Sequence, residues 1–164
     1  YKRQVKKVGG RMWQTGRRVS VNFSDIILFI KNASKYQSTI FIGTDSQPHR
    51  DGTLFVSAIA VTSSNTDYDC RYVYVKHPPI ISYDLFNRVY CETQMSLELA
   101  QDIQREVQEA NIEIHIDVSP ENSRARTSQY ANTLVSMVRG YGFQEVKVKP
   151  DSWCASAIAD SHSK

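Results

Sequence analysis

Carboxylates stand at two points of the chain where a short apolar segment stops. Asp45 ends the β-branched run 39–45 (TIFIGTD), and Asp117 follows the alternating isoleucines of residues 112–116. An isolated aspartate at the end of a strand is usually only a turn former. Two of them on neighbouring strands would place two anions at close range, which is unfavourable without a cation. Because carboxylate oxygens suit hard divalent cations, the pair predicts a Mg²⁺ or Mn²⁺ site.

A third acid, Glu92, falls on the apolar stripe of a helix predicted over about residues 85–110. An unpaired charge on a core-facing stripe costs several kcal/mol or becomes neutralised, so Glu92 is a candidate third ligand. One alternative is an ion pair between Glu92 and Arg88 at the helix boundary. The other is Glu98, but the helical period turns that residue toward the side that carries Asp102.

The fourth acid is either Asp151 or Asp160. Asp151 directly follows the last predicted strand and begins the last helix, where it also suits the N-cap position. Asp160 lies nine residues further on, roughly 13 Å along a helix at 1.5 Å per residue. Proximity to the strand end favours Asp151, and Asp160 is the alternative.

The elements that must position these acids follow from hydrophobic periodicity and turn residues. The pattern predicts a small helix from Phe23, three strands joined by turns, and then helices alternating with two further strands. This β-β-β-α-β-α-β-α order predicts an α/β fold, with a mixed five-stranded sheet in the order 3-2-1-4-5 flanked by helices. The predicted strands cover residues 39–45, 54–62, 71–76, 112–116 and 146–148. Strands one, four and five are parallel, so their carboxyl ends share the edge where ligands bind.

Charge divides the 164 residues into two parts. Residues 1–18 carry seven Lys and Arg and no acid, which leaves 13 basic and 17 acidic residues in the remainder. We therefore expect a basic, flexible arm over residues 1–20 and one domain over residues 21–164. No apolar run approaches the ~20 residues of a membrane-spanning helix, so no membrane partner is expected. Three scattered cysteines fit neither a disulfide framework nor a zinc spacing, which favours reduced thiols and a cytoplasmic location.

Several segments in this order resemble the YkuK-type ribonuclease-H-like family of small bacterial proteins. The resemblance extends from about Phe23 to the C-terminus. It is carried by residues 42–47 (IGTDSQ), 88–96 (RVYCETQMS) with 97–100 (LELA), 114–117 (IHID), 140–143 (GYGF), and 149–156 (KPDSWCAS) through 159–162 (ADSH).

The resemblance implies a nuclease that hydrolyses phosphodiester bonds in RNA or nucleic-acid hybrids with two Mg²⁺ or Mn²⁺ ions. Asp45, Glu92 and Asp117 then become catalytic metal ligands, with Asp151 as the best fourth and Asp160 as its alternative. The resemblance also implies a role for His162 as a mobile proton shuttle, because superfamily members have a histidine with this role. The alternative is that a residue so near the end of the chain is disordered.

Four further residues are predicted to contact the nucleic acid. Ser46 and Gln47 directly follow Asp45, and Arg124 and Arg126 lie in the loop after the fourth strand. Arginine side chains can hold phosphates as planar forks, although solvation is the more ordinary role of surface arginines.

Two other functions are compatible with the sequence. The first is a non-catalytic nucleic-acid-binding module on the same fold, which would use the basic arm. The second is a nucleotide-binding or phosphotransfer relative, since the actin-like ATPase fold shares this sheet. The latter is disfavoured, because a chain of 164 residues lacks a second lobe and contains no glycine-rich phosphate loop.

Overall fold

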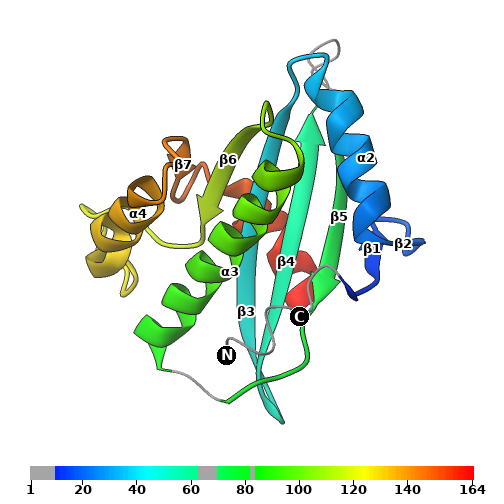
Figure 1. Ribbon diagram of the computed structural model, residues 1–164. Helices are drawn as coiled ribbons and strands as arrows, with labels where there is room; N and C mark the ends of the chain where they lie inside the picture. The colour runs from blue at the N-terminus through cyan, green and yellow to red at the C-terminus, as the bar shows by residue number, and fades with distance from the viewer. Residues whose placement is uncertain (1–9, 63–69, 82–83) are drawn as a thin grey trace.

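The computed structural model describes residues 10–62, 70–81 and 84–164 as a mixed sheet with helices on both faces. Helices α2 (Phe23–Ser34) and α3 (Leu85–Glu106) cover one face (Figure 1). The C-terminal segment, made of η3 (Cys154–Ala159) and α5 (Asp160–Ser163), crosses the opposite face behind β3 and β4. Across the described residues, no helix has both the length and the hydropathy that a bilayer-spanning segment requires.

The sheet has seven strands, so the prediction of five is wrong in number. The central order is as predicted, because β5, β4, β3, β6 and β7 correspond to the predicted order 3-2-1-4-5. Strands β3, β6 and β7 are parallel, and β4 and β5 run antiparallel to their neighbours. In sheet order the strands are β2 (Ser20–Val21), β1 (Trp13–Thr15), β5 (Cys70–Lys76), β4 (Gly52–Thr62), β3 (Thr39–His49), β6 (Asn111–Ile116) and β7 (Val146–Lys147).

The two additional strands come from residues 13–21, most of which belong to the predicted basic arm. Trp13 is fully buried, with its ring 6.2 Å from that of Phe23. Gln14 pairs with Tyr74 across the sheet and accepts a 2.8 Å hydrogen bond from its hydroxyl group. The prediction of a flexible arm is therefore wrong for residues 13–20, because burial of Trp13 and pairing with β5 order this basic segment. Residues 1–9 of the predicted arm lie outside the described residues.

The register between β3 and β6 sets the positions of the first two acids. Thr44 of β3 pairs with Ile116 of β6 in the parallel ladder. Asp45 and Asp117 are the next residue along each of these segments. The parallel alignment brings both aspartates to one level, where β6 ends. The strand predicted over residues 39–45 is longer than expected, because pairing with β4 carries β3 past Asp45 to His49.

Helix α3 supplies the third acid from the face that packs on the sheet. Its N-cap Asp84 accepts a 2.8 Å hydrogen bond from the backbone N–H of Asn87. Val89, Leu99 and Ile103 are buried on the same side as Glu92. The helix predicted between the fourth and fifth strands is also present, as η2 (Ser128–Tyr130) and α4 (Ala131–Gly140).

A glycine allows the C-terminal segment to cross the sheet in direct contact with it. A Cβ atom added at Gly43 would lie 2.5 Å from the backbone nitrogen of Ala155 and 2.8 Å from its Cα. Backbone atoms cannot yield as a flexible side chain can, so only glycine permits this distance between β3 and η3. This crossing brings α5 behind the end of β3.

Candidate functional site

Asp45 is a buried carboxylate that other acids surround. Its side chain is 4% exposed and accepts a 2.7 Å hydrogen bond from Ser163 Oγ in α5. Burial, aided by the charges of Asp117 and Asp160 and opposed by the hydrogen bond from Ser163, raises the pKa of Asp45 to about 6. Three acids from β3, the end of β6 and α5 therefore lie within electrostatic reach of one another.

Glu92 approaches the same region from α3. It is 4% exposed, and Ser46 Oγ donates a 2.5 Å hydrogen bond to Glu92 Oε1. Burial raises the pKa of Glu92 well above its usual value, and the charges of Asp45 and Asp117 add to the shift. The predicted placement of Glu92 on the core-facing stripe is therefore observed.

Arg88 acts on Glu92 through Ser46. Its Nε donates to Ser46 Oγ over 3.1 Å, and its Nη2 donates to the Ser46 carbonyl oxygen over 2.8 Å. The positive charge of Arg88 opposes the rise in the pKa of Glu92. Glu98, the other candidate on this helix, is only partly buried and accepts a 3.2 Å hydrogen bond from Gln94.

Asp117 is held beside a lysine. Lys149 Nζ lies 3.0 Å from Asp117 Oδ1, an ion pair without hydrogen-bond geometry. Oδ1 is buried and accepts no hydrogen bond within the part of the chain that the structure describes. The cation that faces this buried oxygen in the structure is the ammonium group of Lys149.

The structure brings Asp160, and not Asp151, to the other acids. Gln47 Nε2 lies 3.3 Å from Asp160 Oδ1 and 3.5 Å from Asp45 Oδ2, so it bridges the two carboxylates. Asp160 also forms a 2.6 Å ion pair with Lys164. Asp151 is exposed where the chain turns after β7, and its charge acts on His115 instead. The path of the C-terminal segment explains this difference, because α5 at its carboxyl end contacts Asp45 through Ser163.

Four carboxyl groups thus form an acid cluster, which we define as Asp45, Glu92, Asp117 and Asp160. All its donor atoms are oxygens, which fit Mg²⁺ or Mn²⁺ better than softer metals. In the described ranges, however, no three Asp, Glu, His or Cys side chains are grouped closely enough to hold a metal ion. Lys149 and Lys164 neutralise part of the negative charge.

The residues predicted to contact substrate have different surroundings. Ser46 is fully buried and positions Glu92, whereas Gln47 is partly exposed between two acids. Arg124 and Arg126 are exposed in the loop between β6 and η2, where their guanidinium groups are accessible to a ligand.

A buried polar chain that the sequence did not reveal begins at Arg11. Arg11 Nη1 donates to His77 Nδ1 over 2.9 Å, and His77 Nε2 lies 3.0 Å from Ser57 Oγ. Because a guanidinium group can only donate, Nδ1 of His77 is the acceptor and Nε2 carries the proton. Burial, together with the charge of Arg11, lowers the pKa of His77 to about 4 and keeps the ring neutral.

This series of hydrogen-bonded side chains continues to residues near Asp45 and Glu92. Ser57 Oγ lies 2.9 Å from Thr44 Oγ1, which accepts a 2.9 Å hydrogen bond from Ser96 Oγ. Thr44 directly precedes Asp45, and Ser96 lies one helical turn after Glu92. Small hydroxyl residues within apolar strands were the only available signal, and this signal does not identify their partners.

Two histidines hold the C-terminal segment against the sheet. His115 Nδ1 accepts a 3.0 Å hydrogen bond from the backbone N–H of Cys154, and its Nε2 donates to Glu113 Oε1 over 2.8 Å. It therefore anchors the start of η3. His162 stacks on Tyr74 with ring centroids 3.6 Å apart, so in this structure it is a packed side chain.

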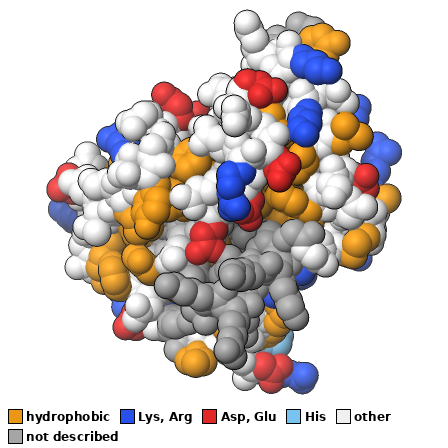
Figure 2. All heavy atoms as spheres, in the orientation of Figure 1, with side chains coloured by type: hydrophobic (Ala, Val, Ile, Leu, Met, Phe, Trp, Pro, Cys, Tyr) orange, Lys and Arg blue, Asp and Glu red, His pale blue; other side chains and the backbone are white. Residues whose placement is uncertain are grey.

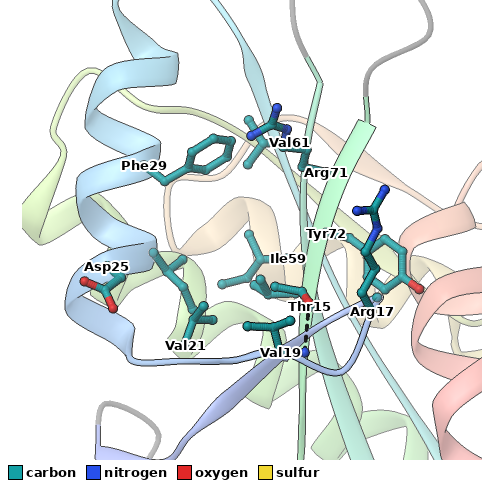
Figure 3. A pocket seen from close by; sticks show the side chains of 13 residues that line it. Thr15, Arg17, Val19, Val21, Asp25, Phe29, Ile59, Val61, Arg71 and Tyr72 are labelled. Atoms are coloured by element: carbon teal, nitrogen blue, oxygen red, sulfur yellow. Dashed lines mark hydrogen bonds between the residues drawn. The ribbon is translucent and has the colours of Figure 1, made fainter.

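A separate pocket of about 780 Å³ lies between α2, the β1–β2 turn and strands β4 and β5 (Figure 3). Its floor is apolar and includes Ile59 and Val61, while Arg17, Arg71 and Asp25 stand at its sides. No member of the acid cluster lines it, so this pocket is distinct from the candidate site.

Comparison with known proteins agrees with this architecture. The sequence profile described as Ribonuclease H-like matches residues 22–164. A protein of Bacillus subtilis (strain 168) named "Uncharacterized protein YkuK" is 24% identical over an alignment that covers 88% of this chain and 92% of that protein. No solved structure matches the chain significantly.

Proposed function

This chain belongs to the ribonuclease H-like family, and we propose that it is a metal-dependent nuclease that hydrolyses phosphodiester bonds in RNA or nucleic-acid hybrids. The observation that carries the proposal is the acid cluster. Asp45 and Glu92 are buried, and each has a pKa that burial and neighbouring carboxylates raise. A fold gains no stability from grouping buried acids in this way, whereas divalent-metal binding would use them.

Asp45, Glu92, Asp117 and Asp160 would hold Mg²⁺ or Mn²⁺, with Asp160 in the place for which the sequence favoured Asp151. When bound, two such ions would supply an activated water and charge stabilisation for the leaving oxygen. The other residues have supporting roles: Ser46 orients Glu92, and Gln47 holds Asp45 and Asp160 in register.

Charge on the chain itself also supports a nucleic-acid substrate. Arg124 and Arg126 are exposed on the segment that leaves Asp117, and guanidinium groups there can receive phosphates. Lys149 and Lys164, paired with Asp117 and Asp160, keep the cluster from being fully negative before a metal binds.

Thermal unfolding with added Mg²⁺ or Mn²⁺ tests the proposed metal site. At a free ion concentration of 100 times Kd, binding to the folded state adds about 2.7 kcal/mol of stability. We expect Asp117→Asn and Asp160→Asn to remove this stabilisation and the matched variant Asp151→Asn to keep it. If Asp151→Asn lost the metal-dependent stabilisation and Asp160→Asn kept it, Asp151 would be the fourth ligand in place of Asp160. Absence of metal-dependent stabilisation in the wild type would reject the metal site.

A non-catalytic nucleic-acid-binding module is the second candidate, and one observation favours it. Lys149 and Lys164 occupy positions beside two acids, where they provide positive charge without a metal. Binding of a labelled RNA–DNA hybrid that is equal with EDTA and with Mn²⁺, without any cleavage, would support this candidate over the nuclease.

A further inference from the structure

A partly exposed aromatic surface lies on α3, which supplies Glu92, and on η2, which follows the loop after Asp117. We define it as Phe86 and Tyr90 on α3 with Tyr130 at the end of η2. Ring centroids lie 5.1 Å apart for Phe86 and Tyr130 and 6.0 Å apart for Phe86 and Tyr90. Phe86 is 38% exposed and Tyr90 is 37% exposed, although aromatic side chains of this size usually gain stability by burial. Tyr130 is partly buried and packs against the hydrophobic core.

The aromatic surface is linked to the candidate site along the chain. Tyr90 is two residues before Glu92 on α3, so the exposed Tyr90 and the buried Glu92 lie on different sides of this helix. Tyr130 ends the segment that begins at Asp117. Contact between Phe86 and Tyr130 joins these two elements. Figure 2 shows hydrophobic side chains gathered at the surface on this side of the molecule, toward α4.

Two arginines precede the aromatic surface on the segment that ends at Tyr130. Arg124 and Arg126 are exposed a few residues before Tyr130, and Gln129 Nε2 donates a 3.1 Å hydrogen bond to the Arg126 carbonyl oxygen. The chain after residue 18 has 13 basic and 17 acidic residues, so general electrostatic attraction from this part cannot hold a nucleic acid. Stacking on exposed rings, aided by two local arginines, can do so.

We propose that the aromatic surface binds unpaired bases of a single-stranded nucleic acid, with Arg124 and Arg126 on its phosphates. The inference deepens the proposed function, on which it rests, because it assigns single-stranded segments as the substrate class. Every base has a π-face, so this mode of binding tolerates different sequences but requires bases that are not already stacked in a duplex.

Fluorescence anisotropy with a labelled 12-nucleotide oligouridine, in EDTA, tests the inference on the full chain. Stacking on aromatic rings predicts that Phe86→Ala and Tyr90→Ser each weaken binding by about tenfold. Tyr141→Ser is the matched control, since Tyr141 is 61% exposed and lies beyond α4, roughly 15 Å along the helix from Tyr130. Tyr90→Phe keeps the ring and is expected to retain affinity.

Salt dependence provides an independent measurement. Each phosphate neutralised on a single strand contributes about −0.7 to the slope of log K against log salt. Removing both arginines in Arg124→Ala/Arg126→Ala is expected to make the slope less negative by about 1.4, while Phe86→Ala leaves the slope unchanged and lowers affinity at all salt concentrations.

Three results would overturn the inference: no binding of the oligonucleotide by the wild type, equal affinity of Phe86→Ala and wild type, or tighter binding of a duplex than of the single strand. Circular dichroism of each variant verifies that it is folded. Because binding is measured in EDTA and cleavage in Mn²⁺, failure of the aromatic surface can be distinguished from failure of the proposed nuclease function. Ring-dependent binding without cleavage rejects only the nuclease, and cleavage with ring-independent binding rejects only the aromatic surface.

Discussion

Replacing Asp45 with asparagine is expected to stabilise the metal-free protein at neutral pH. The carboxylate is buried and lies within electrostatic reach of Asp117, Asp160 and Glu92. Asparagine has nearly the same shape, carries no charge and retains a carbonyl oxygen that can accept the hydrogen bond from Ser163. The substitution therefore removes a buried charge while it leaves the packing almost unchanged.

The magnitude follows from the shift in the pKa of Asp45 from 3.8 to about 6. Two pKa units correspond to about 3 kcal/mol, because one unit is 1.36 kcal/mol. The folded state binds the Asp45 proton more tightly than the unfolded state does. Protonation of Asp45 therefore stabilises the wild type fully below pH 3.8, and this contribution is lost as pH rises through 6. A neutral amide accepts a weaker hydrogen bond from Ser163, so we expect a net gain of about 1–3 kcal/mol in Asp45→Asn at pH 7 and almost none near pH 4.

Urea unfolding of both proteins in EDTA between pH 4 and pH 8 measures this difference. The comparison must be between the variant and the wild type, because His77 has the opposite linkage. Its pKa is lowered to about 4, so its contribution to stability is present above pH 6.5 and is lost as pH falls. This contribution is common to both proteins and cancels in the difference.

The result that would refute the reasoning is a difference in the free energy of unfolding that does not change with pH. A constant difference would mean that Asp45 has the same pKa in the folded and unfolded states. Destabilisation by Asp45→Asn at pH 7 would show that the hydrogen bond from Ser163 outweighs the burial and the charge repulsion.

Three further perturbations test other parts of the structure. Glu92→Gln should also stabilise the metal-free protein at pH 7, because burial and the neighbouring acids disfavour the carboxylate that the unfolded state carries, and a neutral amide avoids this cost while its oxygen can still accept from a hydroxyl group; destabilisation in urea would contradict this. Gly43→Ala should cost about 1–3 kcal/mol, because its Cβ would press on the backbone of Ala155, and an unchanged thermal midpoint would show that the two segments do not touch. Arg11→Ala should raise the pKa of His77 but leave it below 6.5, since burial is the larger cause of its depression; NMR titration of the ring measures this, and an unchanged value would remove Arg11 from the polar chain.

Periodicity and strand ends predicted much of the site because they are local properties of the chain. Asp45 and Asp117 ended recognisable apolar runs, and the parallel crossover placed those runs side by side. Glu92 was identifiable because a charge on an apolar helical stripe is unusual, and it is indeed buried.

The remaining features depend on contacts between distant parts of the chain. The choice between Asp151 and Asp160 is set by the crossing of η3 over Gly43 and by the hydrogen bond from Cys154 to His115, which direct the far end of the segment to Asp45.

The strands of residues 13–21 also escaped prediction, because the burial of Trp13 depends on an aromatic partner, Phe23, and on pairing with β5. In both cases the deciding interaction joins residues that the local sequence pattern does not relate.

Cleavage of a fluorophore-labelled RNA–DNA hybrid that carries a single-stranded RNA extension tests the central claim most directly. The purified protein is incubated with Mn²⁺, and products are separated by gel electrophoresis beside Asp117→Asn and the exposed control Asp151→Asn. The account predicts cleavage by the wild type and by Asp151→Asn, and none by Asp117→Asn or in EDTA. Cleavage that persists in Asp117→Asn, or no cleavage by the wild type under any metal condition, would contradict the assignment of the acid cluster as a nuclease centre.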